Sequence, residues 1–313
     1  MTNALPHITY IRWGEEAGVP DNTTDVEPVT ACNEFFWDTQ SFSDSNSNNL
    51  QKLRALGGGR DVNCTVNGRY DGSLSIDAFV TTDDATLELV LGTLGGGVAT
   101  PSNTIPYFAV EIGYKDFSGN LKRMKFHYCK VNSCKFSQTK SGDPIKATLD
   151  IFVQRPWISN TFGVVATPTD CPFVGYEGIV AIGGVDIVGL QSFDLTITNT
   201  LEKIQSGNSR FDDGLSEGNR DYTYSMTNYF NSDSGITNIV DFFGAATYPT
   251  RSATPTSNSM TWVLTRGANT ITFTFPASSV FVNTASQPSD IGSNLLSQTI
   301  DGHAETLTSI TVV

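Results

Sequence analysis

The chain has 313 residues, a net charge of −13 and a sequence pI near 4.5, so it can hold two cores of ordinary size or one large one. Charged residues make up 16% of the chain and the hydrophobic runs are short, which disfavours an all-helical protein and favours many strands and loops. The acidic balance disfavours a general affinity for the nucleic-acid backbone.

No signal for export or membrane insertion is found in the sequence, and no run approaches the length of a membrane span. The five cysteines are an odd number and widely spread, which is too few for a disulfide framework. We therefore expect a protein that folds in the cytoplasm with reduced thiols.

A strand hairpin with a long loop is the first predicted element. It begins at QSFSDSNSNNLQK, residues 40–52, and passes through the Gly-rich segment 50–59. An alternating run at 60–70, RDVNCTVNGRY, predicts the returning strand.

A short helix and three more strands follow in the same half. The stretch TTDDATLELVLG has Thr and Asp as candidate N-caps and ends at Gly92, which predicts a helix. The sequences YFAVEIGY and MKFHYCKV, separated by the turn DFSGN, predict a second hairpin, and KATLDIFVQ predicts a closing strand.

The same series recurs in the second half. QSFDLTITNTLEK, residues 191–203, is identical to residues 40–52 at six of thirteen positions. It leads through the segment 201–218 into NRDYTYSMTNYF, a helix signal from Asp233 to Gly244, and the strands MTWVLTR, ITFTFPASSVFV and AETLTSITVV. The offset stays between roughly 147 and 160 residues, so the sequence predicts a tandem duplication, with domains at 1–160 and 161–313.

The order of elements resembles that of the tail tube proteins of long-tailed bacterial and archaeal viruses. IRWGEEAGVP is similar to the "E-x-x-x-G-V" opening of one tail tube family of about this length, and SLSIDAFVTTDDATLELVLGTLG resembles its strand–helix segment. QSFDLTITNTLEKI with GNRDYTYSMTNYF resembles its second-half hairpin. The resemblance implies a mostly β (α+β) chain of two tandem tail-tube-like β-sandwich or barrel domains, each with a flanking short helix.

The resemblance also implies the function. The simplest members are single tube domains in six-fold rings, so a duplicated chain is expected to form trimeric rings of pseudo-six-fold symmetry. The stacked rings form the tail tube of the virion, through which DNA passes without specific binding. The implied partners are further copies of the chain and the tape measure, tail terminator, and baseplate or tail-tip proteins, with assembly in the host cytoplasm and no membrane or cofactor.

Inter-ring contacts are implied for the long loop, which in the family reaches the neighbouring ring. The segments 50–59 and 201–218 match this loop by position. The implied contact residues are Leu50, Lys52, Leu53, Arg54, Leu201, Lys203, Ile204, Arg210, Phe211 and Leu215. A mobile surface loop is the commoner role of Gly-rich segments. We expect the segment 201–218 to be a mobile loop that orders only when rings stack.

An acidic tube suits the passage of DNA. Three chains give a formal charge of −39 per ring, and a negative wall offers the DNA backbone nothing to bind. The resemblance implies that much of this charge faces the channel.

The window from Lys115 to Lys146 departs from the acidic trend, because it holds eight Lys or Arg and two acids. Strand alternation in it separates the bases Arg123, Lys125 and His127 from the aromatic side chains. A nucleic-acid-binding strand would place bases and aromatics together. We therefore predict that Arg123, Lys125, His127 and Lys130 form a basic face toward a neighbouring subunit or solvent.

No apparatus for catalysis is visible. His127, Cys129 and Cys134 lack the spacing of a metal site, and the glycine triplets lack the Lys-Ser/Thr ending of a phosphate loop. The adjacent acids Asp83-Asp84 and Asp212-Asp213 are more typical of caps and solvated charge than of a glycosidase pair. We expect no metal and no enzyme.

Two other functions remain open from the sequence. A two-domain β-rich adhesin or carbohydrate-binding module would share this composition, with a sugar platform of Trp157, Tyr222, Tyr224 and Tyr229. A glycosidase is the third choice.

Overall fold

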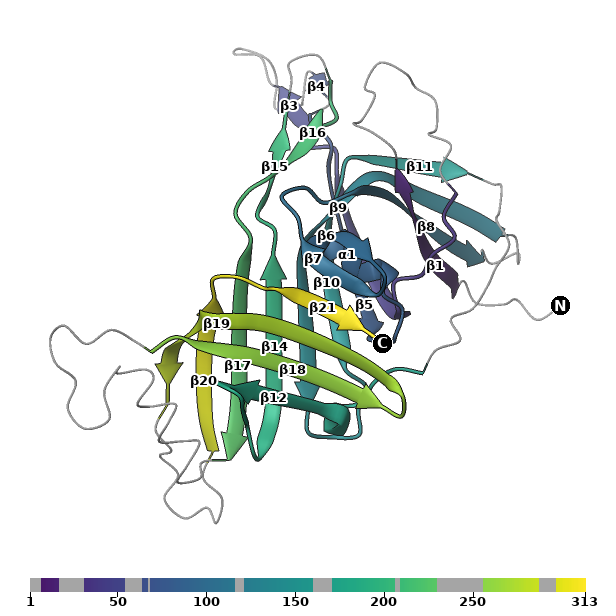
Figure 1. The fold of residues 1–313 in the computed structure, drawn as a ribbon. Coiled ribbons are helices and arrows are strands. Elements are labelled where there is room, and N and C mark those ends of the chain that lie inside the picture. Colours follow the sequence, from purple (N-terminus) through teal and green to yellow (C-terminus); the bar gives the residue numbers. More distant parts are fainter. Residues whose placement is uncertain are drawn as a thin grey trace, which may run out of the picture.

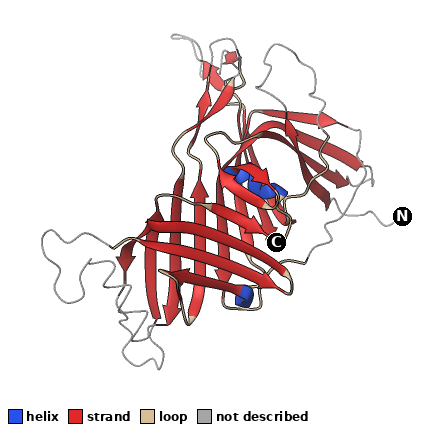
Figure 2. Ribbon diagram, viewed as in Figure 1, coloured by secondary structure: helices blue, strands red, loops and turns tan. Residues whose placement is uncertain are grey.

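The computed structural model of the chain describes residues 7–16, 31–53, 64–66, 68–115, 121–159, 171–205, 209–229, 256–286 and 297–313. Antiparallel strands dominate this part of the chain, beside one helix, α1 (Ala85–Leu91), and one 3-10 turn, η1 (Gly175–Glu177) (Figure 2). The prediction of a mostly β chain is confirmed. The second predicted helix, from Asp233 to Gly244, lies outside the described residues.

One long sheet of eight strands runs through both halves of the chain. In spatial order its strands are β2 (Asp38–Ser47), β5 (Asp71–Phe79), β10 (Lys146–Val153), the end of β9 (Leu121–Thr139), β14 (Leu190–Thr198), β17 (Asp221–Tyr229), β20 (Ser297–Ala304) and the end of β19 (Asn269–Ala285). The halves are joined where β9 pairs with β14. We call this sheet the long sheet.

Each half adds a second layer, and the long strands β9 and β19 belong to both layers. The first half adds β1 (His7–Glu16), β8 (Tyr107–Lys115) and β11 (Arg155–Ser159). The second half adds β12 (Gly178–Ile182), β13 (Val185–Asp186), β18 (Asn258–Arg266) and β21 (Ser309–Val312), extended by β7 (Val98–Pro101) and β6 (Gly92–Gly95) of the first half. In the second half this layer crosses over β14 and β17, as in a β-sandwich (Figure 1).

Two short ribbons project from the same end of the molecule (Figure 1). They are β3 (Gln51–Leu53) with β4 (Cys64–Val66), and β15 (Leu201–Ile204) with β16 (Gly214–Glu217). Each ribbon lies between the two strands of a hairpin, β2 and β5 or β14 and β17. The predicted hairpin of the second half is confirmed, because β14 pairs with β17.

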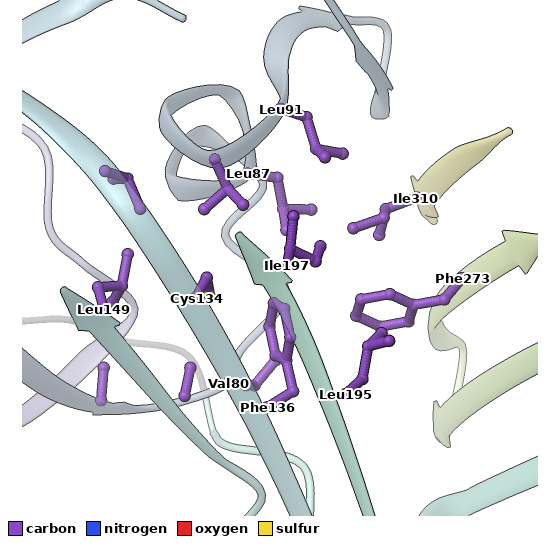
Figure 3. Packing of buried hydrophobic residues seen from close by; sticks show 14 of the residues in the cluster. Val80, Leu87, Leu91, Cys134, Phe136, Leu149, Leu195, Ile197, Phe273 and Ile310 are labelled. Carbon is purple, nitrogen blue, oxygen red and sulfur yellow. The ribbon is translucent and has the colours of Figure 1, made fainter. Parts of the chain in front are cut away.

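Local signals account for α1. The side chain of Asp83 accepts a hydrogen bond from the Ala85 amide at 3.1 Å, and Gly92 ends the helix with a left-handed φ of 100°. The helix buries Leu87 and Leu91 in one hydrophobic core shared by both halves, where they lie near Ile197 and Ile310 (Figure 3). The first-half helix prediction is confirmed.

Irregular positions recur between the halves at a constant spacing. Gln40 in β2 and Gln191 in β14, which are the first residues of the repeated stretch, interrupt the pairing with β5 and β17 at the same place. Each glutamine donates its side-chain amide to the carbonyl oxygen two residues earlier, at 3.2 and 2.9 Å. Asn132 and Asn283, separated by the same offset, interrupt the pairing of β9 with β10 and of β19 with β20.

The bends of the two long strands recur in the same way. Tyr128 in β9 and Ser278 in β19 have left-handed φ angles of 53° and 66° and occupy matching places just before Asn132 and Asn283. At these bends the strands leave the pairing with β8 and β18 and enter the long sheet. Asn49 and Thr200, with φ of 44° and 46°, form a second such pair.

Two predicted correspondences are wrong in detail. The partner of β2 is β5, not the run at 60–70, of which only Cys64–Val66 is a described strand. The counterpart of β10 is β20, because Leu149 faces Ile76 as Ile300 faces Met226. The loop between the two hairpin strands differs in length between the halves. Matching the strands by composition therefore placed the returning strand of the first half at 60–70 instead of at Asp71–Phe79.

Candidate assembly surfaces

One face of the long sheet is lined by hydroxyl groups. Alternation in each strand turns apolar side chains, such as Leu74 and Ile76 of β5, into the core and polar ones outward. The outward hydroxyl side chains include Ser41, Ser43, Ser45, Ser73, Ser75, Ser133, Ser137, Thr148, Ser192, Thr196, Thr198, Thr223, Ser225, Thr227 and Thr299. We call this surface the polar face.

Carboxylates neutralise the lysines of the polar face. Lys135 Nζ lies 3.0 Å from Asp194 Oδ2, and Lys146 Nζ lies 2.9 Å from Asp77 Oδ2. Further carboxylates on this face are Asp150, Asp221 and Asp301. Two bases of the basic window therefore lie on the polar face, and both are paired with acids there.

Asp77 is held in its charged form. Burial alone would raise its pKa, but hydrogen bonds from Lys146, Thr148 (2.8 Å) and Ser41 (3.1 Å) outweigh burial and leave the pKa lowered. The cross-strand pair Asp77–Lys146 thus ties β5 to β10.

The joint between β9 and β14 is a full antiparallel ladder, from Ser192 opposite Thr139 to Thr198 opposite Ser133. At its two ends, Gln191 accepts from the Lys140 amide at 2.8 Å and the Asn199 amide donates to Asn132 at 2.7 Å. The joint therefore unites the sheet strands of the two halves into one continuous sheet.

Buried polar side chains reinforce the joint, and sequence reasoning missed them. Asn199 is 3% exposed and donates to the carbonyl oxygens of Val90 (3.1 Å) and Val131 (2.9 Å). Arg220 donates to Asn199 Oδ1 at 2.6 Å and to the Leu91 carbonyl at 3.3 Å. Second-half side chains therefore bind the last carbonyls of α1 in the first half. In the sequence, Asn199 is marked only by its place within the repeated stretch, and this place does not indicate which residues it contacts.

The long sheet has two edges without a strand partner among the described residues. β2 pairs there with β5 alone, and the end of β19, residues 280–285, pairs with β20. Ser43, Ser45 and Ser47 are exposed on β2, and Asn283 and Thr284 on β19. Such edges are templates for pairing with another chain.

The bases at the start of β9 lie against carboxylates of the same chain. Lys125 is 2% exposed and faces Glu111 of β8 in the ladder. Arg123 lies 2.9 Å from Glu111, which also lies 3.3 Å from Arg12 of β1.

His127 and Lys130 are also buried, and their partners are Glu16 (2.5 Å) and Glu217. These partners come from strands far away in the sequence, so alternation alone could not place them. Within the chain, Lys125, His127 and Lys130 are interior rather than surface residues. The subunit-interface role of the basic face stays a prediction.

The ribbon residues divide into two groups. Leu201 and Leu215 are buried against their own chain, whereas Leu50 and Ile204 are 55% and 51% exposed. The expectation that segment 201–218 is a loop that forms only on ring stacking is wrong, because the single chain already holds β15 and β16 as a ladder. Side chains of the predicted contact residues Lys52, Leu53 and Arg54 lie outside the described residues.

First-half residues hold the second ribbon in place. The Phe211 and Tyr70 rings lie 5.6 Å apart, and Arg210 donates to Asn48 at 2.5 Å. Lys203 bonds to Asp71. The second ribbon is therefore fixed to the first half at the end of the molecule from which both ribbons project (Figure 1). The inter-ring role of these residues stays a prediction.

The alternative functions find little support in the arrangement. Tyr222 and Tyr224 are 4% and 3% exposed, so they cannot form a sugar platform. Asp83 accepts a hydrogen bond from the first amide of α1, and Asp212 is buried beside Lys203. Across the described ranges, no cluster of three metal-ligating side chains occurs, and no helix has the length and apolar character needed to span a membrane.

The fold and these surfaces define a β-rich protein whose long sheet has a polar outward face and, among the residues that the structure describes, two edges without a strand partner. The sequence profile of the phage tail tube protein family matches residues 8–304, nearly the whole chain. The chain belongs to this family and is a structural component of the viral tail that assembles with itself into a tube. No curated protein sequence matches it.

Proposed function

We propose that three chains close their long sheets into one barrel, and that these trimeric rings stack into the tail tube. The observation that carries the proposal is the joint between β9 and β14. In this joint, the last strand of the first half pairs with the first long-sheet strand of the second half. By the sequence repeat, β19 is the counterpart of β9, and β2 is the counterpart of β14. Two open edges that match an existing ladder are expected to pair in the same way.

The joint also supplies a register for the contact between chains. Thr198 faces Ser133 in the joint. With the offset that separates Gln40 from Gln191, Thr198 corresponds to Ser47 and Ser133 corresponds to Thr284. Ser47 of one chain is therefore expected to face Thr284 of the next chain. The repeated irregular positions support the tandem duplication, with domains at 1–160 and 161–313. Three duplicated chains would give a ring of pseudo-six-fold symmetry.

The polar face would line the channel. Its hydroxyl groups and excess of carboxylates offer duplex DNA few cationic contacts, because Lys135 and Lys146 are paired with Asp194 and Asp77. The tube would therefore conduct DNA into the host cell without binding it specifically. Tape measure, tail terminator, and baseplate or tail-tip proteins would complete the tail, assembled in the host cytoplasm. No catalytic role is proposed.

A direct test is the assembly state of the purified protein. We expect sedimentation to give a species of three chains and negative-stain microscopy to show hollow tubes of stacked rings. A strictly monomeric protein that binds glycans would instead favour the adhesin function and overturn the proposal.

Reversing charges on the polar face should create DNA binding. Asp150 and Asp301 are counterparts in β10 and β20, and replacing both by lysine makes each chain more positive by four charges. We expect tubes of the Asp150→Lys/Asp301→Lys variant, assembled with short duplex DNA, to retain it at about 50 mM salt and to release most of it near 200 mM. Co-sedimentation measures this.

The matched control is Glu15→Lys, which changes an exposed carboxylate on β1, away from the polar face and from the ribbons. Equal DNA retention by the control and the double variant would show that the polar face does not line the channel.

A further inference from the structure

Lys203 on β15 lies between two carboxylates that come from different halves of the chain. Its amino group donates a hydrogen bond to Asp71, the first residue of β5. The same Nζ lies 3.9 Å from Oδ2 of Asp212, in the segment that precedes β16. Lys203 and Asp71 are 132 residues apart in the sequence, so the contact joins the second ribbon to the first half.

The amino group of Lys203 is shielded more than those of the polar face. The side chain of Lys203 is 19% exposed and that of Asp212 is 2% exposed, whereas Lys135 and Lys146 are 49% and 47% exposed in their ion pairs. The centre of the Phe152 ring lies 5.2 Å from Lys203 Nζ. Limited access of water strengthens the contacts of the nitrogen and protects it from competing reactions with solvent.

Asp212 is suited to carry a proton. Burial raises its pKa, the nearby charge of Asp71 acts in the same direction, and the attraction of Lys203 offsets these effects only in part. A protonated carboxyl group beside a nucleophile can give its proton to a departing oxygen and take another from the attacking nitrogen. Asp212 therefore has the position and the protonation state of a proton relay between its two neighbours.

The sequence repeat contains the same three residue types in its other copy. The counterparts are Lys52 for Lys203, Asp61 for Asp212, and Asp221 for Asp71. The side chains of Lys52 and Asp61 lie outside the described residues. An ordinary ion pair needs only one of the two carboxylates, so the recurrence of all three residue types favours a role that uses them together.

We propose that Lys203 and Asp71 condense into an amide cross-link, with Asp212 relaying the proton. The nitrogen of Lys203 attacks the carboxyl carbon of Asp71, so that an N–C bond forms and one C–O bond breaks. One hydrogen of the ammonium group stays in the amide. The other two leave with the oxygen as water, and the charges of the ammonium and the carboxylate cancel.

Proximity supplies the driving force for this condensation. Reactants held in a productive geometry behave as if present at effective concentrations of about 10⁵–10⁸ M, which favours a bond that free ions in water do not form. The Asp71 side chain is 64% exposed, which gives the departing water a path to solvent. The cross-link forms within one folded chain and needs no other reactant, so the inference does not depend on ring assembly.

Intact-mass spectrometry of the purified, denatured chain tests the proposal. We expect a mass that is lower than the sequence mass by one water molecule, and a protease digest in which the peptides of Asp71 and Lys203 are joined. Cyclisation of Asp71 onto Gly72 would remove the same mass. Lys203→Arg separates the two reactions, because it keeps the positive charge but cannot form the cross-link, and we expect this variant to have its full mass.

Two further variants test the proton relay. We expect Asp212→Asn to slow formation of the cross-link by about 100-fold or more, so that freshly expressed protein keeps its full mass. Asp213→Asn is the matched control, because it changes the neighbouring carboxylate and should leave the cross-link intact. Circular dichroism verifies that each variant is folded.

The joined peptide of the unsubstituted protein decides the matter even if a variant fails to fold. A full sequence mass for the unsubstituted protein, or a mass deficit that persists in Lys203→Arg, would overturn the inference whether or not tubes form. A cross-link that forms equally fast in Asp212→Asn would overturn the role of Asp212 as the relay. The absence of tubes from a cross-linked protein would contradict the proposed function alone.

Discussion

Replacing Asn46 by proline is expected to stop ring formation while leaving the chain folded. The backbone groups of Gln191 and Asn199 in β14 form hydrogen bonds with β9. Because backbone direction alternates along a strand, the other odd-numbered residues between them, including Ile197, also direct their amides toward β9. Asn46 is the counterpart of Ile197 in β2, and its amide faces the open edge. Proline removes that donor and places a ring against the incoming strand.

The cost falls on assembly. Each carbonyl left unsatisfied in a buried ladder costs about 1–3 kcal/mol, and the loss recurs at three contacts per ring. Sedimentation should therefore show monomers where the unsubstituted protein shows trimers. Asn46→Ala is the matched control, because it loses the same side-chain bonds to Tyr70 and Asp44 but keeps the amide. Normal rings from Asn46→Pro would mean that β2 does not form the contact.

Replacing Trp262 by alanine should cause a large loss of folding stability. Its ring is fully buried and stacks on Phe273 with centroids 4.5 Å apart, beside Phe193 at 5.1 Å. Its indole Nε1 donates to Gln138 Oε1 at 2.7 Å, which ties the second-half layer to β9 of the first half. We expect Trp262→Ala to lower the free energy of unfolding by roughly 3–5 kcal/mol, out of a total of about 5–15 kcal/mol.

Urea denaturation at one low protein concentration measures this loss without a contribution from assembly. Trp157→Ala is the control, because Trp157 lies on β11 and is only partly buried. A loss below about 1 kcal/mol for Trp262→Ala would show that this aromatic cluster does not stabilise the fold.

Local patterns predicted the elements that depend on neighbours in the sequence. The Thr and Asp residues before Ala85 and the glycine at position 92 predict α1, and the repeated Gln-Ser-Phe marks the start of a hairpin in both halves. The structure adds the reason for the repeat, because Gln40 and Gln191 are the extra residues of two equivalent bulges.

Long-range partners could not be predicted from the same patterns. Lys125 and His127 alternate as a solvent-facing strand would, but Glu111 and Glu16 of other strands accompany them in the interior. Glycines at 207, 214 and 218 suggested a loop, yet Leu201 and Leu215 are buried against the first half. In each case a tertiary contact outweighs the local preference, and the open edges of the long sheet become visible only once every other strand has a partner.

Cross-linking Ser47→Cys to Thr284→Cys tests the central claim most directly, that three chains close into one ring through β2 and β19. In the joint, Ser133 and Thr198 form a non-hydrogen-bonded pair, in which Cβ atoms come close enough for a disulfide. Both double variants are made in a Cys171→Ser background, which removes an exposed thiol. Ser133→Cys/Thr198→Cys should therefore form a disulfide within one chain and serves as the positive control. For Ser47→Cys/Thr284→Cys, the account predicts a non-reducing gel with bands of one, two and three chains that ends at three. A ladder that ends at six or continues, or no linked chains while the control forms its disulfide, would contradict it.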